Sequence, residues 1–137
     1  MDFPLITYDP ETGLATVGIP TNPRVTRGVD KLSQIVCLAV LKNGGQDVFT
    51  PGEGSGLRAL IGQYNHYDPS EIQAEVIRRV KLIEQQIIAN QLGYSLPATE
   101  KLVKLRVLSV VVDSVTWNTA VRIQIINEAG QSIVTVV

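Results

Sequence analysis

Residues 100–137 alternate between apolar and polar side chains with a period of two, and this alternation most constrains how the chain can fold. In residues 101–113, Val103, Leu105 and Val107 alternate with Lys104 and Arg106. Residues 115–126 repeat the pattern, with Val115, Trp117, Val121, Ile123 and Ile125 on one face. A tight Asp113-Ser114 join and a turn over Asn127–Gln131 divide the region into three strands, the last of which is Ser132–Val137. The pattern predicts a three-stranded antiparallel meander.

The third strand is aliphatic up to the last residue of the sequence. A strand edge that is left exposed promotes association unless another strand pairs with it or a segment covers it. We therefore expect this strand to bind a partner strand through its backbone. The candidate partner-binding residues are Ile133, Val134, Thr135, Val136 and Val137.

Before the meander, the sequence predicts a hairpin and then helices. Residues 5–18 are predicted to form this hairpin, in which residues 5–8 and 14–17 flank the turn sequence Asp9-Pro10-Glu11-Thr12-Gly13, which suits a type I turn closed by glycine. An extended linker over residues 18–30 leads to a helix over residues 30–42, with Asp30 as its N-cap. Because residues 35–41 are apolar at every position, we expect this helix to be buried on all sides.

The longest predicted helix begins at Ser70, which forms a capping box with Gln73, and ends near Leu92. Glu75 and Arg79 are four residues apart and can pair. Ser55 opens a shorter helix over residues 55–61. The apolar stripe of the long helix comprises Ile72, Val76, Val80, Ile83 and Ile87.

Together these elements predict one α+β domain over residues 1–137. It divides into a hairpin and linker (1–29), a helical part (30–93) and a β-meander (100–137).

Composition argues against several classes of function. The 137 residues include 12 basic and 13 acidic ones, so no basic excess favours a nucleic-acid backbone. Aromatic residues make up 5%, which disfavours a base-stacking surface. No run approaches the roughly 18 apolar residues of a membrane span, and the N-terminus lacks the pattern of a signal peptide. We expect neither nucleic acid nor a membrane as partner, and synthesis in a cytoplasm.

Residues that could carry chemistry have simpler interpretations. The chain has one cysteine, Cys37, within the apolar helix, and one histidine, His66, in a polar loop, so no metal-ligand cluster forms. We read Cys37 as a buried thiol and His66 as a solvated residue. Gly52–Gly56 precedes a helix but lacks the Gly-Lys-Ser/Thr ending of a phosphate loop. We expect no cofactor, no metal and no enzymatic activity. Glu100 is either a surface charge or an interface residue, and Lys104 and Arg106 fit a solvated sheet face.

The order of segments resembles the sheath-initiator, or baseplate wedge, family of contractile phage tails, which has relatives in Mu-like phages and in type VI secretion baseplates. The resemblance rests on the N-terminal hairpin, the helix over residues 32–41, the segment 48–61 with its Gly54-Ser55-Gly56-Leu57 sequence, the long helix and the C-terminal meander.

This resemblance implies a structural protein of the virion. Members of the family lie in the tail baseplate near the inner tube, bind wedge proteins, and offer strands on which the first ring of sheath subunits polymerises. It therefore implies that the tail sheath protein, baseplate wedge proteins and tail tube or hub proteins are partners. It also implies six copies per baseplate, and strand augmentation at residues 133–137.

Many members carry Glu-Pro-Arg between the long helix and the first strand. This chain has Thr99-Glu100-Lys101-Leu102 there, so only Glu100 matches, as a candidate partner-binding residue. Three alternatives stay open: a cellular adaptor of the same fold, a bacterial contractile injection system, and a small-ligand domain that uses the loop over residues 44–56.

Overall fold

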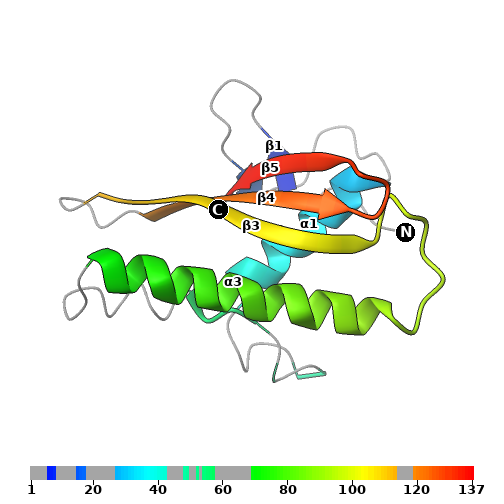
Figure 1. The fold of residues 1–137 in the computed structure, drawn as a ribbon, viewed down its shortest axis with the longest axis horizontal. Helices are drawn as coiled ribbons and strands as arrows, with labels where there is room; N and C mark the ends of the chain where they lie inside the picture. The colour runs from blue at the N-terminus through cyan, green and yellow to red at the C-terminus, as the bar shows by residue number, and fades with distance from the viewer. Residues whose placement is uncertain are drawn as a thin grey trace.

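The computed structural model describes residues 6–8, 15–17, 27–42, 48–49, 52, 54–57, 69–113 and 119–137. Over these residues the fold is α+β, with two helices and a C-terminal three-stranded antiparallel sheet (Figure 1). The helices are α1 (Val29–Leu41) and α3 (Pro69–Gln91). The sheet consists of β3 (Leu102–Val112), β4 (Thr119–Asn127) and β5 (Ser132–Val136). Two short strands, β1 (Ile6–Tyr8) and β2 (Ala15–Val17), pair with each other in antiparallel orientation.

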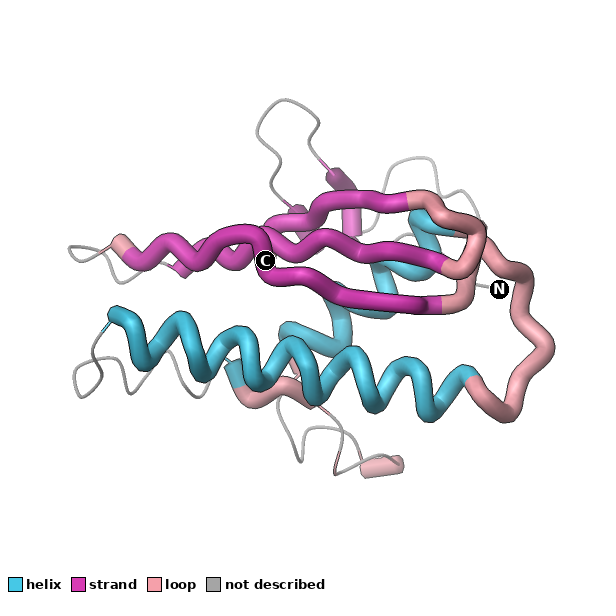
Figure 2. Tube along the Cα trace, viewed as in Figure 1, coloured by secondary structure: helices cyan, strands magenta, loops and turns pink. Residues whose placement is uncertain are grey.

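The order β3-β4-β5 confirms the predicted meander. In β4, Val121, Ile123 and Ile125 are buried, whereas Arg122 between them is exposed. Strand alternation therefore separates an inner face, which packs on the helices, from an outer face. Figure 2 shows α1 crossing behind the sheet and α3 running beside β3, and α3 contacts β3 while α1 contacts β5.

The long helix buries the stripe that its sequence predicts. Ile72, Val76, Val80, Ile83 and Ile87 are all at most 6% exposed. The helix begins at Pro69, one residue before the predicted start, which is within the usual uncertainty of helix ends. Glu75 and Arg79 pair at 2.8 Å between Oε1 and Nε, as predicted from their spacing.

The first helix differs from the prediction in two respects. It begins at Val29 with Gly28 as N-cap, so Asp30 lies inside the first turn. It also buries one face rather than every side, because Ile35 and Leu38 are 37% and 39% exposed. A run of apolar residues shows that one face can be buried, but only the neighbouring elements determine whether the opposite face is covered.

The start of β3 departs from simple alternation. A register shift between Leu102 and Lys104 places Val103 as an extra residue opposite β4. As a result Val103 is 51% exposed, whereas Leu102 and Leu105 are buried. Strict alternation predicts Val103 on the same face as Leu105, and this prediction is wrong.

Several predictions fall outside the described residues: the turn over residues 9–13, most of the linker, the loop with His66, and the strand start at residues 115–118. The short helix predicted over residues 55–61 is described only as far as Leu57.

Candidate partner-binding edge

The five terminal residues proposed to bind a partner belong to the edge strand β5 or follow it directly. Ile123 faces Thr135 and Ile125 faces Ile133 in the register of β4 with β5. Thr135 is completely buried, and Ile133 and Val137 pack against the core from the same face. Val134 and Val136 have the opposite parity and lie on the outer face.

The hydrogen bonds show which backbone groups of this strand point away from the sheet. Val121 and Val137 exchange both backbone hydrogen bonds, each at 2.9 Å between N and O. Because antiparallel pairs alternate, the N–H and C=O groups of Val136, Val134 and Ser132 point away from β4. Val134 already takes part in a further interaction within the chain. Ser132 and Val136 are therefore the outward-facing positions that a partner strand can address.

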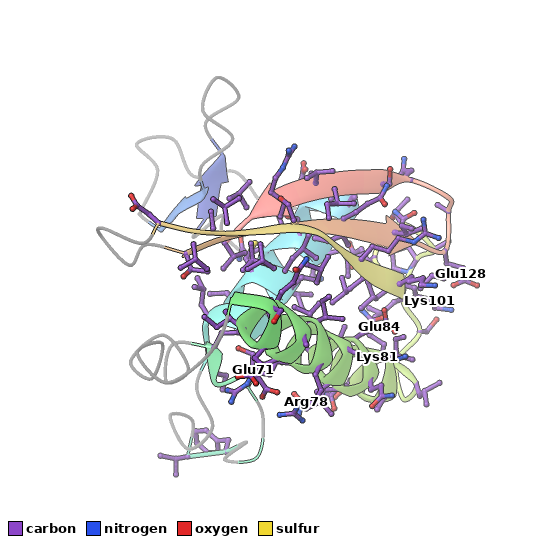
Figure 3. All side chains as sticks on the ribbon, turned by 60° about the vertical axis from the view of Figure 1, so that its left-hand side comes forward. Glu71, Arg78, Lys81, Glu84, Lys101 and Glu128 are labelled. Carbon is purple, nitrogen blue, oxygen red and sulfur yellow. The ribbon has the colours of Figure 1, made fainter. Side chains whose placement is uncertain are left out.

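At the opposite edge of the sheet, which β3 forms, side chains of α3 accept hydrogen bonds from backbone N–H groups of the strand. The N–H of Leu105 donates to Oε2 of Glu84 at 2.6 Å, and the N–H of Leu102 donates to Oε1 of Gln91 at 2.9 Å. Gln91 also donates through Nε2 to the carbonyl oxygen of Glu100 at 3.0 Å. Figure 3 shows Glu84 on α3, on the side of the helix that faces the sheet. These contacts occupy the backbone N–H groups of Leu102 and Leu105 on the β3 edge.

Glu84 and Gln91 had no assigned role in the sequence. The available signal was their separation of seven residues, which places them on the same side of a helix, beside the apolar stripe. That they reach a strand backbone is a tertiary feature with no local signature.

The candidate residue Glu100 makes its contacts inside the chain. Its Oε1 accepts a hydrogen bond from the N–H of Gly28 at 3.2 Å, and its Oε2 lies 3.2 Å from Nζ of Lys31. The side chain is 12% exposed. Glu100 thereby makes the contact that the N3 carboxylate makes in a capping box, because it accepts from the N–H of the N-cap residue Gly28, although it comes from a distant segment. A carboxylate is favourable at this position because helix N-termini carry partial positive charge.

The glycine-rich segment closes the other end of α1. The hydroxyl of Ser55 donates to the carbonyl oxygen of Val40, and the N–H of Ser55 donates to that of Lys42 at 3.0 Å. Nη1 of Arg79 donates to the carbonyl oxygens of Ser55 and Gly56 at 3.1 and 2.5 Å. Ser55 and Gly56 therefore link α1 to α3.

Cys37 connects α1 with β5. Its Sγ lies 3.2 Å from Oγ1 of Thr135, and the thiol is 1% exposed. Burial raises the pKa of Cys37, while the hydrogen bonds to Thr135 and Ser33 act in the opposite direction. The predicted buried thiol is confirmed, and its partner on β5 is new.

Groups that could support catalysis or metal binding are sparse in the described part of the chain. Among these residues, no three His, Cys, Asp or Glu side chains gather as a metal site. None of the described helices has the length and apolar character needed to cross a membrane. A hollow of about 320 Å³ lies between the end of α3 and the start of β3, where Lys101 and Glu128 pair with each other at 3.4 Å. Its lining is Ile88, Gln91, Leu92, Tyr94, Lys101, Leu102, Val103 and Glu128.

Comparison of the chain with protein-family models, with curated proteins and with solved structures finds no match.

Proposed function

We propose that this chain is a structural component of a contractile phage tail baseplate, where it binds wedge proteins and initiates sheath polymerisation by strand augmentation. The proposal places the protein in the virion, in six copies per baseplate. It includes an N-terminal hairpin over residues 5–18 and a first helix central to the domain, in the order of segments that the sequence resemblance rests on.

The observation that carries the proposal is the difference between the two edges of the sheet. On β3, Glu84 and Gln91 occupy outward-facing backbone donors. On β5, Ser132 and Val136 direct their N–H and C=O groups away from β4. A protein that adds one strand at a defined place benefits from this asymmetry, since a covered edge disfavours pairing at the wrong side.

The packing of the inner face of β5 against the core also fixes the register of β5 with β4. Thr135 is buried and bonded to Cys37, so β5 cannot slip by one residue without turning Thr135 to the outer face. A partner strand therefore meets a strand whose register is fixed. Main-chain hydrogen bonds of this kind supply the affinity in strand augmentation, and the alternating side chains supply the specificity.

The test is to mix the full chain with a tail sheath protein of the same phage and to follow amide hydrogen exchange by NMR. We expect the amides of Ser132 and Val136 to become protected. Those of Leu102 and Leu105 serve as internal controls, because α3 already bonds them, and should not change. Binding that leaves Ser132 and Val136 unprotected, or no binding of the sheath protein, would contradict the proposal. Capture of a host protein by the same two amides would favour the cellular adaptor instead.

A further inference from the structure

The outer face of the three-stranded sheet gathers three exposed cations. Lys104 and Arg106 are two residues apart on β3 and share this face. Arg122 on β4 lies opposite Ser109, while Arg106 lies opposite Gln124, which makes Arg106 and Arg122 diagonal neighbours. Diagonal neighbours on adjacent strands lie about 7–8 Å apart. The three positive charges therefore form one compact group.

No acidic residue of the sheet offsets this charge. The sequences of β3, β4 and β5 contain neither aspartate nor glutamate. The ion pairs found among the described residues involve Lys31, Arg78, Arg79 and Lys101, and these cations belong to other parts of the chain. Like charges at this spacing repel one another, and a carboxylate placed between them would relieve that repulsion.

Aliphatic side chains accompany the cations. Val111, which lies opposite Ala120 on the outer face, is 59% exposed, and Leu108, the extra residue at the register shift between Val107 and Ser109, is 50% exposed. Ile126 faces Lys104 and is half-buried. The face thus offers positive charge and apolar surface together, which is typical of a protein interface with a polar rim.

We propose that this outer face is a docking surface for an acidic protein segment in which carboxylates alternate with aliphatic side chains. The carboxylates would lie between Lys104, Arg106 and Arg122, and the aliphatic side chains would cover Val111 and Ile126. Charge complementarity selects the occupant, because a neutral or basic segment would leave the three cations repelling one another.

Nucleic acid fits the same face less well. Phosphate-backbone binding gains its strength from many cations along a path, and single-stranded bases need aromatic faces to stack on. The three strands carry three cations and no Phe, Tyr or Trp. Docking at this face does not require strand pairing at β5, so this proposal and the proposed function can be tested independently of each other.

The experiment is an NMR titration of the full chain with an acidic peptide of alternating glutamate and valine, at low and at moderate salt. We expect amide shift changes centred on Lys104, Arg106 and Arg122, with weaker affinity at higher salt. The double variant R106Q/R122Q should bind the peptide about 10-fold more weakly. The matched control R27Q/K81Q removes the same charge from exposed cations outside the sheet and should bind as the parent does.

Three outcomes would overturn the proposal. The first is the absence of binding at low salt, and the second is an equal loss of affinity in both double variants, which would indicate a general effect of net charge. The third is tighter binding of a short single-stranded DNA than of the peptide, with the same shift changes, which would make the face a nucleic-acid surface. Circular dichroism of each variant establishes that it is folded.

Discussion

The backbone N–H of Leu105 donates a hydrogen bond to the carboxylate of Glu84 across 2.6 Å, and this bond joins the long helix to the open side of the first strand of the sheet. The donor belongs to a strand edge that would otherwise be available to another chain. Gln91 repeats the arrangement at Leu102, two turns further along α3. The helix therefore stabilises the sheet through its apolar stripe and also covers its edge through polar side chains.

Replacement of Glu84 tests this second role. Glu84→Ala removes the acceptor of the Leu105 N–H and should lower the free energy of unfolding by about 1–2 kcal/mol. Glu84→Gln keeps an acceptor oxygen and should retain most of the stability. Urea denaturation measures both, with Gln85→Ala as the control on the exposed side of α3. Equal stability of the Glu84→Ala and Gln85→Ala proteins would show that the hydrogen bond is of no consequence.

A side chain at Gly56 should be costly for two reasons. The residue has φ = +64°, which L-residues other than glycine adopt only with strain, and a Cβ there would lie 2.6 Å from Nη1 of Arg79. Gly56→Ala should therefore destabilise the protein by about 1–3 kcal/mol and loosen the contact of Arg79 with Ser55. Gly52→Ala is the matched control, since its Cβ would meet open space. Thermal unfolding of the two variants gives the comparison, and similar melting temperatures would contradict the assignment.

The change in the free energy of unfolding at acidic pH should depend on Glu75. Hydrogen bonds from Arg78 and then Arg79 lower the pKa of Glu75 to about 2, from an ordinary value of 4.5. Because the folded pKa is the lower one, the ionised carboxylate stabilises the fold above pH 4.5, and this contribution is lost as the pH falls through about 2. The pair with Arg79 is partly exposed, so it contributes only about 0.3–0.5 kcal/mol. Carboxyl NMR titration measures the pKa of Glu75. In the Glu75→Gln protein, the midpoint of urea unfolding should depend less on pH between 4.5 and about 2 than in the parent.

The thiol of Cys37 should resist modification in the native protein. Reaction requires an exposed thiolate, whereas this side chain is 1% exposed and burial raises its pKa. A disulfide reagent should label the unfolded chain at once and the native chain only as fast as the protein opens. Native labelling at the rate of a free cysteine would mean that α1 does not pack on β5 as described.

The sequence predicted those parts of the fold that depend on local periodicity. The stripe of α3 and the buried residues Val121, Ile123 and Ile125 follow directly from spacings of 3.6 and 2. The bulge at Val103 could not be predicted, because one extra residue in a strand leaves no local signal. The same applies to the N-terminus of α1. Asp30 is a good capping residue, but the helix begins at Val29, and the carboxylate that bonds the N–H of the N-cap residue Gly28 comes from Glu100.

The candidate site was predicted only in part for the same reason. An aliphatic strand that follows two others along the chain can be recognised as an edge strand from its position and composition. Which edge is covered depends on side chains that are distant in sequence, such as Glu84 and Leu105, which are 21 residues apart. The use of Glu100 inside the chain likewise depends on Gly28, 72 residues away.

The most direct test of the outward-facing edge of β5 is a proline at Val136. Val136→Pro removes an N–H that points away from β4 and leaves the bonds between Val121 and Val137 in place, so the fold should be retained. Val136→Thr keeps the N–H and serves as the control. Electron microscopy of tails assembled with each variant gives the measurement. We predict baseplates and tubes without sheath for the folded Val136→Pro protein, and normal sheath for Val136→Thr. Normal sheath on baseplates that contain folded Val136→Pro protein would contradict the account.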